Sequence, residues 1–184
     1  TRNSLASDIS TTRQEQVNLT PSTLLNKWKE ICSSPSFVEN NMEIKKQNGV
    51  TTIVKEEGRP FRVLQLTDIH IGGGILCFRK DRWALEAVEK VVKAADPDLI
   101  VMTGDMVYPL FWATGARNNK RPAKKLATLL QSLGKPWCFA FGNHDGEVFA
   151  TYTKEQLGEY FKSFDGCLYE KGEEGITGCG NYCI

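Results

Sequence analysis

The chain has 184 residues, of which 41% are hydrophobic and 24% are charged, so it can fold as one domain with a sizeable core. Its formal net charge of +1 excludes an overall field that would attract nucleic acid or an anionic membrane, and any phosphate recognition has to be local. No apolar run approaches the roughly 20 residues that a membrane-spanning helix needs. The six cysteines form no C-x-x-C pair and the chain has only two histidines, which argues against a zinc finger.

Residues 1–58 are predicted to form an N-terminal extension. Its beginning is polar and has no apolar period, whereas residues 21–32 place leucines, a tryptophan and an isoleucine at helical spacing. This spacing predicts a short amphipathic helix, and the β-branched run at 50–54 predicts a strand. The chain begins at Thr1 rather than at methionine, so a targeting segment could precede it, and secretion or membrane anchoring stays open.

From residue 59 onward strand and helix patterns alternate, which predicts a mostly parallel sheet flanked by helices, an α/β fold. The expected strands lie at 61–67, 98–104 and 136–142, with 167–170 and 181–184 as candidate final strands. The first helix is expected to begin behind an N-capping Asp81, and the second to end at Gly134. The third should begin behind Thr153, where Gln156 completes a capping-box pattern.

Polar residues directly follow each of the three central strands. The segments read TDIH at 67–70, TGD at 103–105 and GNHD at 142–145. Ligands of parallel α/β sheets bind outside the carboxyl ends of the strands, so these side chains should converge. The candidate site residues are Asp68, His70, Asp105, Asn143 and His144. Each alone would be an ordinary cap, turn former or surface residue, but together their oxygen and imidazole donors suit Zn²⁺, Mn²⁺ or Fe.

The motifs D-x-H, G-D and G-N-H-D, each after a strand, resemble the calcineurin-like metallophosphoesterase family over roughly residues 60–184. The resemblance implies a partial metallophosphoesterase sandwich, with residues 59–184 as the N-terminal part of the domain and the C-terminal half missing. It also implies two divalent metal ions, Mn, Zn or Fe. By this resemblance Asp68 and His70 would hold one ion, Asp105 would bridge both, Asn143 would ligate the second, and His144 would be the general acid.

The function implied by the resemblance is hydrolysis of a phosphoester. Two ions can clamp a phosphate and lower the pKa of a bridging water, which gives a hydroxide that attacks in line. The departing oxygen then needs a proton, and an imidazole such as that of His144 is suited to supply it. The expected partner is a phosphorylated substrate, because the sequence carries no strong nucleic-acid signal.

Two further features lie near the proposed site. The segment GDMVY resembles the G-D-x-x-Y of purple acid phosphatases, with Tyr108 in the tyrosine position. Those enzymes lack the D-x-H histidine, so the presence of His70 favours a loop or packing role for Tyr108. Arg117, Asn118 and Asn119 lie beyond the second central strand and could contact substrate phosphate.

Several alternatives stay open. The later family motifs G-H and G-H-x-H are absent, since no histidine follows His144, and we therefore expect the chain as given to be truncated and inactive alone. A non-catalytic phosphate- or metal-binding scaffold module is the alternative function, and a phosphodiesterase acting on nucleotides or nucleic acid is a third. Cys179 and Cys183 could form a disulfide in an oxidising compartment.

Overall fold

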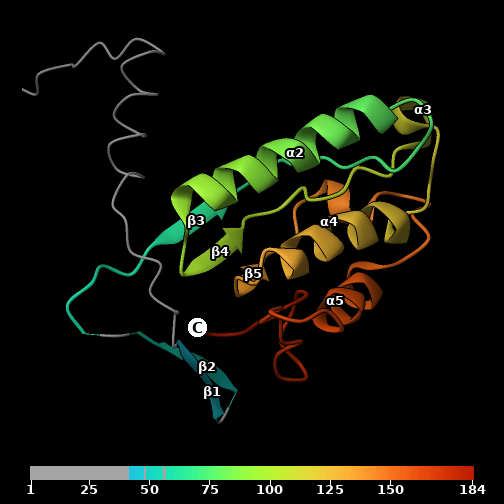
Figure 1. The fold of residues 1–184 in the computed structure, drawn as a ribbon. Coiled ribbons are helices and arrows are strands. Elements are labelled where there is room, and N and C mark those ends of the chain that lie inside the picture. Colours follow the sequence, from blue (N-terminus) through green and yellow to red (C-terminus); the bar gives the residue numbers. More distant parts are fainter. Residues whose placement is uncertain (1–41, 48, 56) are drawn as a thin grey trace, which may run out of the picture. The chain divides into compact units, whose positions relative to one another are not determined.

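The computed structural model describes residues 42–184 apart from 48 and 56 (Figure 1). The helix expected at 21–32 lies outside the described residues. In chain order the elements are β1 (Glu43–Gln47), β2 (Val50–Val54), β3 (Val63–Leu66), α2 (Phe78–Ala95), β4 (Leu99–Met102), α3 (Phe111–Thr114), α4 (Lys120–Ser132), β5 (Trp137–Phe139), a short 3₁₀ helix (His144–Gly146) and α5 (Lys154–Lys162). None of the helices in this part of the chain has the length and apolar character needed to cross a membrane.

The three central strands form a parallel sheet in the order β3-β4-β5. Val63 pairs with Leu99, and Ile100 pairs with Trp137, so the carboxyl ends of the strands lie at one edge. The connections between them contain α2 and α4, as parallel neighbours require. The predicted parallel, adjacent strands are thus confirmed, although each strand is shorter than expected.

Helices cover one face of this sheet. Ile100 and Met102 of β4 are fully buried there, in one cluster with Val92 of α2 and Leu126 of α4. Helix α4 contacts both α2 and α5 (Figure 1). The residues that alternate with these, such as Leu99, point to the opposite face, where a smaller apolar cluster reaches β2. The core therefore holds the sheet rigidly beneath the strand ends.

An antiparallel hairpin of β1 and β2 precedes the sheet. β2 confirms the strand expected at 50–54, whereas β1 was not expected, because every residue of EIKKQ is exposed and the segment has no apolar alternation. The two final strands were predicted wrongly: Cys167 and Cys183 form isolated bridges only, because the glycine-rich stretch between them adopts left-handed backbone repeatedly. Cys179 and Cys183 are free thiols in the structure.

The helix boundaries confirm two predictions and correct one. Gly134 is left-handed just beyond α4, and Thr153 forms the capping box with Gln156 at the start of α5. α2 begins a turn earlier than expected, with Cys77 as its N-cap, so Asp81 lies inside the helix. The Asp81 carboxylate is buried and accepts 2.9 Å hydrogen bonds from two successive glycine N–H groups of the loop after β3. Asp81 is therefore a brace for that loop and not a helix cap.

Candidate metal centre

The loops that follow β3 and β4 run side by side beyond the sheet. The backbone N–H of His70 donates to the carbonyl of Asp105 at 2.9 Å. Ile71 and Val107 continue this pairing as an isolated parallel bridge. The D-x-H segment is thereby fixed directly beside Asp105, at the edge where the strands end.

The backbone of this edge is strained. Asp68, His70 and Asp105 adopt left-handed conformations, with φ of 54°, 52° and 51°. Residues with a side chain rarely adopt this conformation, and strain of this kind concentrates at functional sites. The paired loops hold the three residues in place against their local preference.

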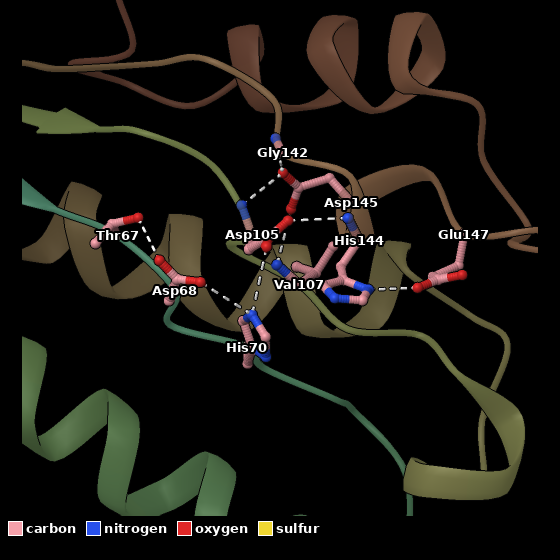
Figure 2. Close-up of polar contacts among 9 residues, drawn as sticks. All are labelled: Thr67, Asp68, His70, Asp105, Val107, Gly142, His144, Asp145 and Glu147. Atoms are coloured by element: carbon pink, nitrogen blue, oxygen red, sulfur yellow. Dashed lines mark hydrogen bonds and ion pairs between the residues drawn. The ribbon is translucent and has the colours of Figure 1, made fainter.

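The His70 imidazole lies between two carboxylates (Figure 2). Its Nε2 is 3.5 Å from Oδ1 of Asp68 and 3.6 Å from Oδ2 of Asp105. This nitrogen is buried and has no hydrogen-bond partner among the residues that the structure describes, although buried polar atoms normally have one. Ligand atoms of His70, Asp105 and His144 also lie within 4.8 Å of one another. A buried imidazole nitrogen facing carboxylate oxygens is a donor set that fits a divalent metal ion.

Asp145 ties the loop after β4 to the loop after β5. Its fully buried carboxylate accepts hydrogen bonds from the backbone N–H groups of Asp105 at 3.1 Å, Val107 at 2.9 Å and Gly142 at 2.8 Å. Burial raises the pKa of Asp145, while the N–H groups of Val107 and Gly142 act in the opposite direction. Sequence reasoning assigned Asp145 no role, and its position within GNHD was the available signal.

Gly142 is required by the same close approach of the two loops. A Cβ atom built at Gly142 would lie 2.2 Å from Oδ1 of Asp105 and 2.5 Å from its backbone nitrogen. Any side chain at this position would displace the Asp105 carboxylate. The glycine that begins GNHD thus leaves room for a proposed metal ligand on the neighbouring loop.

His144 is fixed through its backbone and its ring. Its backbone N–H donates to Oδ1 of Asp105 at 2.9 Å. Its ring Nδ1 contacts Oε1 of Glu147 (Figure 2). The contact with Glu147 occupies Nδ1, which leaves Nε2 for other chemistry. Sequence reasoning missed Glu147, although its spacing of three residues from His144 was a usable signal.

Tyr108 lies between the two histidines of the site. Its ring stacks on His70, with centroids 5.2 Å apart, and meets the edge of His144 at 4.7 Å. Tyr108 is therefore a packing residue, as the sequence favoured, and it packs inside the candidate site. Asn143 is exposed at the start of the 3₁₀ helix, and its side chain forms no hydrogen bond or ion pair with the described residues.

The three residues that begin the segment before α4 differ in their environments. Asn119 is fully buried, and its amide bonds to backbone atoms of Asp145 and Tyr152, so the expectation that it contacts substrate was wrong. Asn118 is exposed, and its Oδ1 accepts the N–H of Arg121 at 3.0 Å near the start of α4. Arg117 is exposed and lies over aromatic rings.

Comparison with known proteins agrees with this geometry. The calcineurin-like phosphoesterase family matches residues 61–179, more than half of the chain. Three similar proteins come from Arabidopsis thaliana. "Probable inactive purple acid phosphatase 14" is 29% identical over 68% of this chain and 34% of its own length. "Probable inactive purple acid phosphatase 29" is 27% identical over 66% of this chain and 34% of its own length. "Probable inactive purple acid phosphatase 28" is 23% identical over 79% of this chain and 40% of its own length.

The alignments leave most of each relative unmatched, since this chain spans between 34% and 40% of their lengths. Within that span, the family match includes all three strand-end motifs and both paired loops. The chain belongs to the calcineurin-like phosphoesterase family.

Proposed function

We propose that the protein is a metal-dependent phosphoester hydrolase with a two-ion site at the carboxyl edge of its parallel sheet. The observation that carries the proposal is the buried Nε2 of His70, which has no hydrogen-bond partner among the described residues and lies between the carboxylates of Asp68 and Asp105. Asp68 and His70 would hold one ion, Asp105 would contact both, and Asn143 would ligate the second. Mn, Zn and Fe all suit this mixture of oxygen and imidazole donors.

Bound ions would supply charge neutralisation for a phosphoryl group and a lower pKa for a coordinated water. The residues of the chain provide orientation. The Asp105 side chain is only 13% exposed. Its backbone is fixed by the pairing with His70 and by one hydrogen bond to Asp145, and its carboxylate accepts the backbone N–H of His144. A carboxylate held in this way loses little freedom when a ligand binds, which supports its role as the shared ligand.

His144 is proposed as the general acid. With Nδ1 held by Glu147, its Nε2 can hold the proton that the departing oxygen needs. The Glu147 carboxylate fixes the orientation of the ring through its contact with Nδ1. Glu147 is therefore a positioning residue for His144 in this proposal.

A non-catalytic phosphate- or metal-binding scaffold is the second candidate function. It is supported by the printed names of the relatives, all three of which are described as probable inactive phosphatases. In either function the ligand would be a phosphorylated molecule, with Arg117 and Asn118 as further contacts. The two candidates differ in turnover and agree in metal binding.

Hydrolysis of p-nitrophenyl phosphate separates these functions. The assay uses the natural protein that carries this sequence, after chelation and again after addition of Mn²⁺, Zn²⁺ or Fe²⁺. We expect no turnover after chelation and recovery with at least one of these metals. Metal binding without turnover would favour the scaffold, and the absence of both would contradict the metal centre.

A further inference from the structure

Arg117 lies against two aromatic rings of the strand-end loops. Its guanidinium carbon lies 5.3 Å from the ring centroid of Phe111 and 5.5 Å from that of Phe149. Within the described part of the chain, Arg117 forms no ion pair and its side-chain N–H groups donate to no acceptor. Cation–π contacts fix a guanidinium without using its hydrogen-bond donors. We call these three residues the arginine clamp.

Two backbone features hold the residues of the arginine clamp in place. Phe149 has a left-handed backbone with φ of 72°, which costs energy for a residue with a bulky side chain. The carbonyl of Arg117 accepts the N–H of Thr151 at 3.1 Å, so the loop after β4 is joined to the loop after β5 at this point. The two rings and the guanidinium therefore belong to one connected structure.

The clamp adjoins the metal centre along both loops. Phe111 follows Tyr108 by three residues, and the Tyr108 ring stacks on His70. Phe149 follows Glu147 by two residues, and Glu147 contacts the ring of His144. The clamp is thus carried by the same strand-end loops that carry proposed ligands and the proposed acid.

The rings of the clamp are exposed together with other large apolar side chains of these loops. Phe111 is 50% exposed and Phe149 is 68% exposed. Their exposed apolar neighbours in the strand-end loops are Ile75, Leu76, Trp112 and Val148. Exposed apolar surface of this kind often marks a binding site. The Arg117 guanidinium, whose N–H groups donate to no acceptor among the described residues, can bind an anionic group there, and the apolar side chains can contact the carbon skeleton that carries it.

We propose that the arginine clamp binds a second anionic group, a carboxylate or a phosphate, on the substrate. The protein would then select phosphoesters that carry a second anionic group besides the phosphoryl group being hydrolysed. This inference rests on the proposed function, in which the metal ions neutralise the reacting phosphoryl group and leave Arg117 free for another anion. Carboxylate and phosphate share the geometry that a guanidinium binds through two parallel hydrogen bonds.

Two matched pairs of substrates test the selectivity. 3-Phosphoglycerate is compared with glycerol 3-phosphate, and fructose 1,6-bisphosphate with fructose 6-phosphate, so the pairs distinguish a carboxylate from a phosphate. For whichever second anion is selected, Arg117→Gln should lower kcat/KM about 10- to 100-fold, mainly through KM, as expected for a lost charge-assisted hydrogen bond. For glycerol 3-phosphate and fructose 6-phosphate, which carry one anionic group each, kcat/KM should change less than about twofold.

Arg121→Gln is the matched control, because Arg121 is exposed in the first turn of α4 and contacts no aromatic ring of the described residues. It should leave all four substrates unchanged. If Arg117→Gln lowered kcat/KM equally for substrates with one and with two anionic groups, or did not lower it at all, the clamp would not be a specificity element.

A binding measurement keeps this test separate from catalysis. In the chelated protein, the NMR resonance of the Arg117 Nε–H group, assigned with Arg117→Gln, is followed during titration with 3-phosphoglycerate, fructose 1,6-bisphosphate and their singly anionic partners. We expect a doubly anionic ligand to saturate the shift at lower concentration. Selective binding without hydrolysis would contradict the proposed function and support the clamp. Hydrolysis with no preference in binding or turnover would support the function and contradict the clamp.

Discussion

Asp105→Asn is expected to remove metal binding and phosphoester hydrolysis together. The substitution preserves the shape of the side chain and leaves the backbone hydrogen bond to Asp145 in place. It removes the negative charge that would hold two cations close together, and an amide is a weaker ligand than a carboxylate. Metal affinity should fall by at least about 100-fold, because even residues that only support a ligand cost 10- to 100-fold.

The measurement combines isothermal titration with Zn²⁺ or Mn²⁺ and the hydrolysis rate of an aryl phosphate at the same metal concentration. Asp96→Asn is a matched control, because Asp96 is exposed at the C-cap of α2 and bonds to Lys135 there. Asparagine also tolerates the left-handed backbone of that position. Unchanged metal affinity in Asp105→Asn would exclude Asp105 from the ligand set.

His144→Ala is expected to keep most of the metal and to lower kcat about 10²- to 10⁴-fold, the usual range for a lost general acid. The loss should be smallest for aryl phosphates with good leaving groups, because these depart without a proton. Rates measured across a series of leaving groups therefore test the role directly. Glu147→Gln should cause a smaller loss with the same dependence on the leaving group, because it only positions the ring.

Two outcomes would change the role of His144. An equal loss for good and poor leaving groups would argue against proton donation. A fall in metal affinity as large as that of Asp105→Asn would instead make His144 a metal ligand. The geometry permits this role, because a ring nitrogen of His144 lies within 4.8 Å of ligand atoms of His70 and Asp105. In that case Glu147 would orient a metal ligand and not an acid.

The sequence predicted the sheet because its central strands carry strong local signals. Leu99–Met102 is a continuous apolar run between polar segments, as expected for a strand covered on both faces. The convergence of Asp68, His70, Asp105 and His144 then follows from parallel topology, which brings strand ends to one edge. The same rule was applied to Asn143, which is the exposed N-cap residue of the 3₁₀ helix that follows β5.

The sequence did not predict the buried carboxylates that hold the loops of the site, because their hydrogen-bond partners are backbone groups. Asp145 accepts the N–H groups of Asp105 and Val107 on a loop that is distant in sequence, and Asp81 accepts those of two successive glycines in the loop before its helix. No side-chain pattern identifies such partners. Asn119 was expected to contact substrate phosphate because it lies beyond a strand end, yet its amide bonds to the backbone of Tyr152 and is buried. β1 was missed because hairpin pairing, and not an apolar pattern, makes it a strand.

Anomalous diffraction from crystals of the protein grown with Zn²⁺ tests the metal centre most directly. We predict a peak within about 2.0–2.2 Å of Nε2 of His70 and of a carboxylate oxygen of Asp105, the usual coordination distances for this metal. A second peak should share Asp105 and approach Asn143. Metal peaks only at other places on the molecule, with His70 and Asp105 free of metal, would contradict the account.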